Sequence, residues 1–206
     1  MDLRRTLLLF SFIFTGSLAI AQPKDRWTIQ DGGAIRWSIN DNIPHDDHLE
    51  MSGQQLSVVL RYGVDAQKRF HLNRSLVFPM LRMHPNKTQN NLKQRFDVNI
   101  PALVTVDDQT LLNEEVRDVT FNGIMRVESS FGYIYRRKEL KDAVQLTRVL
   151  YPSTNAAHYC EEYTFKNSSP NQITLRVPEW NVTYTTPEEA GVYGAYCIEA
   201  ALSKSG

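Results

Sequence analysis

The sequence predicts an all-β fold, an antiparallel β-sandwich with few, short helices. Apolar and polar residues alternate with a period of two along most of the chain, whereas helical periodicity hardly occurs. Turn-forming residues separate the alternating segments at short intervals, as at Asp31-Gly32-Gly33 and Ser52-Gly53. Many short strands bounded in this way are typical of two stacked antiparallel sheets and not of βαβ units. Because no repeat or linker interrupts the pattern, we expect a single domain over residues 22–206.

Six segments carry the alternation that predicts strands. Successive side chains of a strand face opposite sides of its sheet, so each segment can turn one apolar stripe toward a core. The segments are residues 34–39, 56–62, 119–127, 144–150, 173–177 and 192–200. Helix is expected at only two places, a single turn at 186–189, where Pro187 and two acidic residues suit a helix start, and a short stretch at 108–116.

The first 21 residues have the three parts of a secretory signal peptide. Arg4 and Arg5 precede the apolar run 7–14, and Ala19-Ile20-Ala21 forms a small-residue cleavage site. A transmembrane anchor needs about 20 apolar residues, more than this run provides. We therefore expect cleavage after Ala21 and a secreted or periplasmic protein without a membrane span.

Composition limits the partners of the mature chain. The sequence has 23 basic and 23 acidic residues, so no positive excess exists to neutralise phosphates, and we expect no nucleic-acid partner. A hydrophobic content of 42% favours a packed domain over disorder. Since the sequence has neither a CxxC pair nor a phosphate-binding glycine loop, we expect no metal and no cofactor.

The densest polar cluster lies at residues 44–53, just before the predicted strand 56–62. His45, Asp46, His48 and Glu50 combine imidazoles with carboxylates, groups that hydrogen-bond sugar hydroxyls, act as acid or base, or bind a cation. A metal site is disfavoured, because His-x-x-His in an extended segment directs its two rings to opposite sides. The segment is either a ligand-facing loop, with these four residues as substrate-binding candidates, or a solvated turn.

Trp180 is the candidate for an aromatic platform. It follows Pro178-Glu179 at the end of the predicted strand 173–177, whereas Trp37 lies inside the alternating segment 34–39. An exposed tryptophan offers a flat apolar face to a sugar ring, while a buried one fills the core. Both roles stay open for Trp180, which we place with the substrate-binding candidates.

No catalytic residue is identified. A nucleophile elbow of the form G-x-S-x-G is absent from the sequence. Hydrolysis of a glycoside needs two carboxylates that face one cleft, and the chain has the doublets Glu114-Glu115, Glu161-Glu162 and Glu188-Glu189. Adjacent residues of a strand point apart, so we interpret these doublets as ordinary edge or turn charges.

Cys160 and Cys197 are the only cysteines of the chain. A disulfide between them is possible in an oxidising compartment. The alternative is two buried free thiols, because both cysteines lie within apolar strand segments and a domain of this size does not need the bridge. Spacing alone leaves both states open.

Two regions resemble the N-terminal sandwich of secreted bacterial six-hairpin glycosidases. The first runs from Trp37 to Asp65 and includes Pro44-His45-Asp46-Asp47-His48 and Leu60-Arg61-Tyr62-Gly63. The second is Leu146-Thr147-Arg148-Val149-Leu150-Tyr151-Pro152-Ser153, followed by Glu162-Tyr163-Thr164-Phe165-Lys166-Asn167.

The resemblance implies a supersandwich-like domain that precedes an (α/α)6 barrel, and the barrel holds the catalytic acids in that family. No paired amphipathic helices follow Leu202, so the catalytic half is absent from this sequence. The first hypothesis is therefore an accessory sandwich of a glycoside hydrolase acting on polysaccharide, present here as a fragment or truncated copy. The alternatives are a stand-alone carbohydrate-binding module and a small secreted hydrolase with an unrecognised carboxylate pair.

Overall fold

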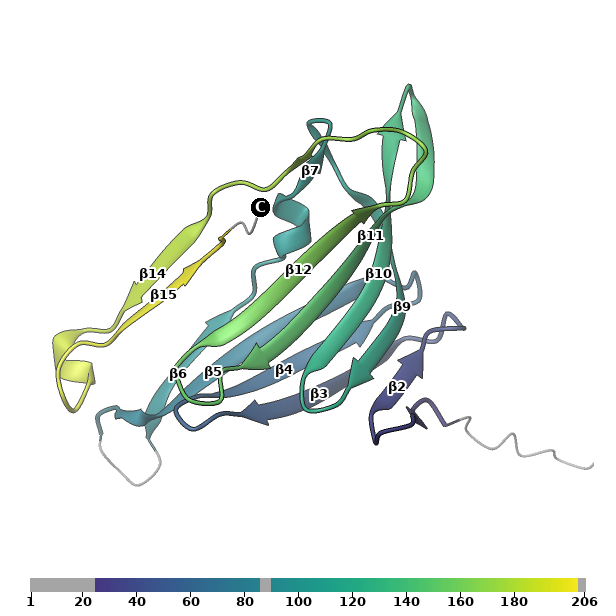
Figure 1. Cartoon of the computed structure of the whole chain (residues 1–206). Coiled ribbons are helices and arrows are strands. Elements are labelled where there is room, and N and C mark those ends of the chain that lie inside the picture. The colour runs from purple at the N-terminus through teal and green to yellow at the C-terminus, as the bar shows by residue number, and fades with distance from the viewer. Residues whose placement is uncertain (1–24, 86–89, 204–206) are drawn as a thin grey trace, which may run out of the picture.

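The computed structural model describes residues 25–85 and 90–203, which form two main antiparallel sheets. Figure 1 shows one sheet lying behind the other, with the larger sheet in front. The predicted all-β sandwich is confirmed. The predicted signal peptide, residues 1–21, lies outside the described residues. Among the residues that the structure describes, no helix is long and apolar enough to cross a membrane.

The larger sheet has six strands in the order β1-β2-β9-β10-β11-β12. The strands are β1 (Thr28–Ile29), β2 (Ile35–Ser38), β9 (Leu112–Phe121), β10 (Met125–Tyr135), β11 (Lys138–Pro152) and β12 (Tyr159–Asn167). The single strand predicted at 119–127 is wrong, because the chain turns at Asn122-Gly123, where Gly123 adopts a φ of 95° that favours glycine. The helix predicted at 108–116 is also wrong, since most of this stretch belongs to β9.

The smaller main sheet has four strands in the order β3-β4-β5-β6. They are β3 (His45–Ser52), β4 (Ser57–Val64), β5 (Phe70–Arg82) and β6 (Asn91–Phe96). Each strand pairs with its sequence neighbour in antiparallel register, so β3 and β6 are the edges. The predicted strand 56–62 corresponds to β4, whose alternating side chains turn Val58, Leu60 and Tyr62 into the core.

Short elements close one end of the sandwich and extend it at the other. The strands β7 (Thr105–Val106), β8 (Gln109–Thr110) and β13 (Leu175–Arg176) form a small sheet, and β14 (Asn181–Thr185) pairs with β15 (Cys197–Ala201) in a ribbon beside the sandwich (Figure 1). Helical structure in the described ranges is limited to two 3-10 turns, η1 (Ile100–Leu103) and η2 (Glu188–Ala190). The second of these confirms the single turn predicted at 186–189.

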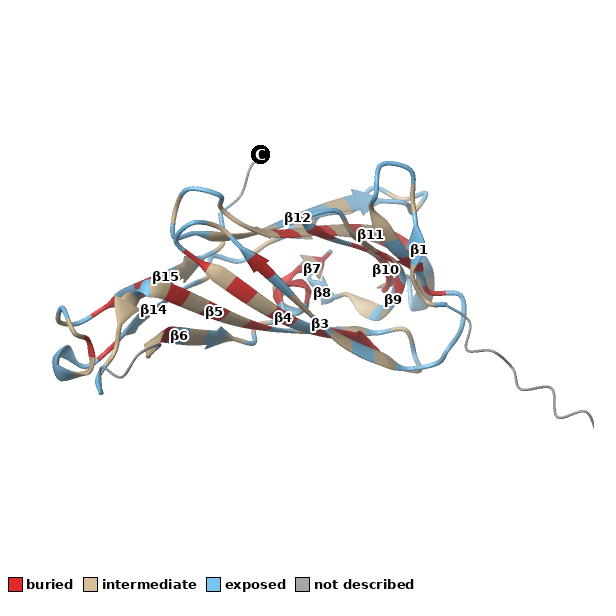
Figure 2. Cartoon of the chain, turned by 90° about the horizontal axis from the view of Figure 1, so that it is seen from below, coloured by how far each residue is buried: buried red, intermediate tan, exposed pale blue. Residues whose placement is uncertain are grey.

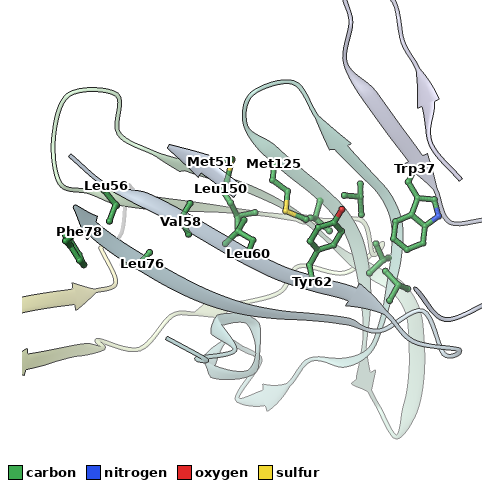
Figure 3. Packing of buried hydrophobic residues seen from close by; sticks show 14 of the residues in the cluster. Trp37, Met51, Leu56, Val58, Leu60, Tyr62, Leu76, Phe78, Met125 and Leu150 are labelled. Carbon is green, nitrogen blue, oxygen red and sulfur yellow. The ribbon is translucent and has the colours of Figure 1, made fainter. Parts of the chain in front are cut away.

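The space between the two main sheets holds the hydrophobic core. Figure 2 shows the two layers edge-on, with buried residues recurring along strands of both. The larger of two apolar clusters includes Leu56, Val58 and Leu60 from the four-stranded side and Met125 and Leu150 from the six-stranded side (Figure 3). The smaller cluster lies farther along β10 and β11, where the small sheet covers them; its buried residues are Val106, Phe131, Tyr133, Ala143, Val144 and Leu146.

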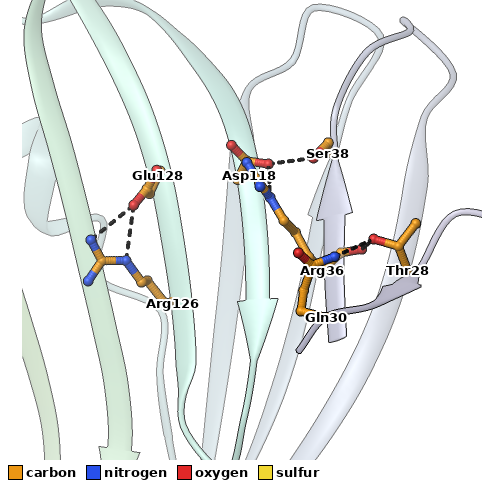
Figure 4. Close-up of polar contacts among 7 residues, drawn as sticks. All are labelled: Thr28, Gln30, Arg36, Ser38, Asp118, Arg126 and Glu128. Carbon is orange, nitrogen blue, oxygen red and sulfur yellow. Dashed lines mark hydrogen bonds and ion pairs between the residues drawn. The ribbon is translucent and has the colours of Figure 1, made fainter. Parts of the chain in front are cut away.

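One ion pair on the outer face of the six-stranded sheet joins the short strand β2 to β9. Arg36 Nε lies 2.7 Å from Asp118 Oδ1, and the Ser38 hydroxyl donates to the same oxygen at 2.6 Å (Figure 4). The hydrogen bond from Arg36 is the main reason that the pKa of Asp118 lies below its ordinary value. These contacts tie β2 to β9.

Candidate functional site

The predicted ligand-facing segment is a strand and not a loop. His45 to Ser52 form β3, the edge of the four-stranded sheet, and pair residue by residue with β4. Because alternate residues of a strand face opposite sides, the four candidates do not act as one group. Asp46, His48 and Glu50 lie on the exposed outer face, whereas His45 lies on the face that carries Leu49 and Met51.

His45 is a packing residue and not part of an exposed cluster. Its ring lies edge-on to Trp37, with 5.0 Å between the ring centroids. Its Nε2 atom is buried without a hydrogen-bond partner and lies 3.7 Å from Asp47 Oδ2. Trp37 is itself buried, as expected for an alternating strand.

Asp46 instead pairs with a histidine that the sequence did not single out. Asp46 Oδ1 lies 2.6 Å from His71 Nε2, across the intervening β4 residue Gly63. A Cβ at position 63 would overlap both the Asp46 carboxylate and the His71 ring. Because Gly63 has no side chain, residues of β3 and β5 make contact across the outer face of β4.

Two further rows of polar side chains lie beside this pair on the outer face. His48 is in register with Arg61 and Asn73 across three strands, and all three residues are exposed. In the next row Glu50 is in register with Ser75 of β5, with the apolar Val59 of β4 between them. We call the outer surface made by these three rows the β3–β5 face. It offers donors and acceptors of both charge signs in a regular array.

The remaining sequence candidates lie away from the β3–β5 face. Trp180 is partly buried, and its carbonyl accepts a hydrogen bond from Leu202 N–H at 2.8 Å at the end of the β14–β15 ribbon. The structure thus does not bring Trp180 together with Asp46, His48 and Glu50.

Cys160 and Cys197 are free thiols in the structure. Cys160 lies in β12 and Cys197 in β15, and the possible disulfide between them is not formed in the structure. Cys197 is exposed, which corrects the expectation that both free thiols are buried.

The sandwich interior contains charges that sequence reasoning missed. Arg74 of β5 faces Glu161 of β12 across the space between the sheets; its Nη2 donates to Glu161 Oε2 at 2.8 Å and its Nη1 to the Val98 carbonyl at 3.0 Å. The Tyr163 hydroxyl donates to the same carboxylate at 2.5 Å. Burial alone would lower the pKa of Arg74, but the hydrogen bonds and charge of Glu161 raise it above its ordinary value.

A second buried ion pair lies in the six-stranded sheet itself. Arg148 Nη1 of β11 is 2.6 Å from Glu114 Oε1 of β9 and donates to the Ser129 hydroxyl at 3.0 Å. The Arg148 guanidinium also lies 5.1 Å from the centroid of the Phe70 ring, a cation–π contact. We call the set Arg74, Glu114, Ser129, Arg148, Glu161 and Tyr163 the polar seam.

The polar seam separates the two apolar clusters. Along β10, Ser129 lies between Val127 of the larger cluster and Phe131 of the smaller one, and Arg148 divides Leu146 from Leu150 along β11. The interpretation of Glu114 and Glu161 as edge or turn charges is therefore wrong. Each is the inward member of its doublet, because it is in phase with the apolar residues of its strand.

A cavity of about 370 Å³ opens where the polar seam meets the end of the sandwich. Phe70 and Glu114 line it together with Asn113, Phe131 and the turn residue Arg69. Asp65 holds that turn by accepting hydrogen bonds at 2.9 Å from the backbone N–H groups of Gln67 and Arg69. Burial alone would raise the pKa of Asp65, but these bonds and the Arg69 side chain lower it overall.

These features define a β-sandwich with a polar outer face, a charged seam inside and a cavity at one end, an architecture that hosts many unrelated functions. No protein-family model, no curated protein and no solved structure matches the chain. Function must therefore be inferred from the residues of the chain itself.

Proposed function

We propose that the chain is a secreted, non-catalytic β-sandwich domain of a glycoside hydrolase, and that it contacts polysaccharide through the β3–β5 face. The observation that carries this proposal is the regular array of exposed polar side chains on that face, led by the Asp46–His71 pair. Carboxylates, imidazoles and amides spaced along strands match the spaced hydroxyl groups of a sugar chain. The resemblance of residues 37–65 to glycosidase sandwiches supports the same assignment, because β3 and β4 lie in that region.

The buried glutamates support a non-catalytic role. Glycoside cleavage needs one carboxyl group that transfers a proton and a second that acts as base or nucleophile, both facing one cleft. Glu114 and Glu161 are inward carboxylates of the sandwich, and each is paired with a buried arginine. In this proposal, the chemistry belongs to an (α/α)6 catalytic domain, and the sandwich positions the polysaccharide beside it.

Affinity electrophoresis of the secreted protein in gels containing xylan, β-glucan, mannan or pectin tests the proposal, in parallel with reducing-sugar assays. We expect retardation in at least one gel without release of reducing sugar. His48→Ala and Glu50→Ala should each weaken the retardation, whereas Thr164→Ala, at an exposed position of β12, should not.

Two results would overturn the proposal. Equal retardation of the His48→Ala and Glu50→Ala variants would exclude the β3–β5 face. Hydrolysis by the chain, abolished by Glu50→Gln, would make the chain an enzyme in its own right.

A further inference from the structure

The β14–β15 ribbon has a free edge along β14. Figure 1 shows the ribbon beside the sandwich, with β14 on the side away from β12. Among the described strands β14 pairs only with β15, and all five of its residues are exposed. Its outer edge therefore presents unpaired backbone N–H and C=O groups, which can pair with another strand.

β14 differs from the other free edges because it carries no charge. Sheet edges that stay unpaired are usually short, or they carry proline or charged side chains that oppose pairing with another chain. Within residues 25–85 and 90–203, the edge strands β1, β8 and β13 have two residues each, and β3, β6, β12 and β15 all carry charged side chains. The sequence of β14, Asn181-Val182-Thr183-Tyr184-Thr185, has neither a charge nor a proline. Among the described edges, β14 alone is both long and unprotected.

The apolar face of the ribbon also ends at this edge. Cross-strand partners lie on the same face of a sheet, and Tyr184 is paired with Ile198 and Val182 with Ala200. Ile198 is 8% exposed and belongs to the larger apolar cluster, whereas Tyr184 and Val182 are 39% and 40% exposed. The apolar surface therefore continues from the core across β15 and stays open to water on β14. Since a two-stranded ribbon is only marginally stable in water, a further strand beside β14 would stabilise it.

The sequence of β14 is complementary to itself in the antiparallel orientation. When two copies of the strand pair about Thr183, Tyr184 of each copy lies opposite Val182 of the other, and Asn181 lies opposite Thr185. An aromatic residue opposite a β-branched one is a favourable cross-strand pair, and no like charges meet in this register. The same pairing of β3, β6 or β12 with itself would place several charged side chains against one another. Charge therefore favours a second copy of the chain at β14 and at none of these three edges.

We propose that two copies of this chain form a symmetric dimer through antiparallel pairing of β14 with β14. The two ribbons then make one four-stranded sheet in the order β15-β14-β14-β15, and Val182 and Tyr184 of both copies pack together on its apolar face. Because both copies use the same edge, the contact closes as a dimer and does not propagate. A pairing of five residues is a small interface, so the dimer is weak. It does not depend on the proposed binding of polysaccharide, because the β3–β5 face belongs to a different sheet.

Sedimentation equilibrium of the secreted protein, without polysaccharide and at concentrations from about 5 μM to about 1 mM, tests this proposal. We expect a monomer–dimer equilibrium with a Kd of about 10–100 μM. Thr183→Lys places two ammonium groups opposite each other at the centre of the paired strands and should raise the Kd by about threefold to tenfold. Thr164→Lys is the matched control, because it adds the same charge at an exposed threonine of the edge strand β12 and should leave the Kd unchanged.

An equimolar mixture of the Thr183→Lys and Thr183→Glu variants provides the second measurement. Opposite charges then face each other between the two copies, so the mixture should dimerise more tightly than either variant alone, a recovery that misfolded variants would not show. A monomer at every concentration would overturn the proposal and leave the β14 edge to a different protein. Oligomers larger than a dimer, an equal rise in Kd for Thr164→Lys, or a mixture that dimerises no more tightly than its components would also overturn it.

Discussion

The polar seam and the β3–β5 face both join carboxylates to basic side chains, but in opposite surroundings. In the seam, the side chains of Arg74 and Glu161 are 6% and 13% exposed. On the outer face, the corresponding values for His71 and Asp46 are 50% and 80%. The two sites therefore contain similar groups at similar distances, and they differ mainly in access to water.

This difference assigns the two sites different roles. A buried charge that loses its partner cannot be solvated, so removing one member of a seam pair destabilises the fold. An exposed pair exchanges freely with water and contributes little stability, so its groups are available to a ligand. Burial, more than residue type, separates structural charges from candidate binding charges in this chain.

The largest expected effect comes from breaking a seam pair. Arg74→Met leaves Glu161 charged and unpaired between the sheets, and we expect the free energy of unfolding to fall by about 3–5 kcal/mol. Urea unfolding followed by tryptophan fluorescence measures the change. The double variant Arg74→Met with Glu161→Leu removes both charges and should recover most of the loss. If the free energy of unfolding falls by less than about 1 kcal/mol in the single variant, the Arg74–Glu161 pair contributes no more than an exposed ion pair does, which would contradict its structural role.

Alkaline pH should also distinguish buried from exposed groups, with a smaller effect on the free energy of unfolding. Burial, followed by the charge of Glu161, raises the pKa values of Tyr159 and Tyr163 above their ordinary value. These tyrosines stay neutral in the folded protein above pH of about 10, where the unfolded chain ionises. Their stabilising contribution is therefore complete below that pH and is lost as the pH rises toward the folded pKa values.

The unfolding midpoint in urea, measured between pH 8 and pH 11 at constant ionic strength, tests this dependence. Tyr163→Phe should flatten the decline, since one buried phenol is removed. Tyr193→Phe is the control, because Tyr193 is 78% exposed, and it should decline as the unmodified chain does. An identical decline in both variants would contradict the role of the seam tyrosine.

The smallest effect on stability is expected for the outer pair. Gly63→Ala places a methyl group between Asp46 and His71 and forces them apart, but both are exposed side chains that can rotate away. We expect the free energy of unfolding to change by less than about 1 kcal/mol while polysaccharide retardation weakens. The His71 ring resonances in NMR spectra should also shift as the pair separates.

Gly53→Ala provides the comparison for this variant. The added methyl group would meet the backbone carbonyl of Ser153, which cannot rotate away, so the loss should be larger, about 1–3 kcal/mol. Equal losses for Gly53→Ala and Gly63→Ala would show that the outer pair is not free to adjust.

The strands of this fold were predictable where one face is apolar throughout. Val58, Leu60 and Tyr62 alternate without a polar exception, and β4 follows that pattern. β3 was predicted as a loop because His45 and Asp47 occupy inward positions next to Leu49 and Met51. Polar residues on both faces hide the period of two, and only pairing with β4 fixes the segment as a strand.

The site was less predictable than the fold, because it depends on contacts between distant strands. One usable signal was present: Arg148 is in phase with Leu146 and Leu150, so its side chain had to face inward with them. The partner of such a charge comes from another strand, and sequence spacing did not identify Glu114. The Asp46–His71 pair likewise depends on the register of three strands and on the missing side chain of Gly63.

The seam also determines how freely the two apolar clusters can diverge in sequence. Ser129 and Arg148 stand between them, so a change of side-chain volume near Val58 has no continuous apolar path to Tyr133. Substitutions at separated, uncoupled positions add in free energy to within about 0.5 kcal/mol. Apolar substitutions can therefore be made in one cluster, by evolution or by design, without compensating substitutions in the other. This holds as long as the polar residues between the clusters are kept.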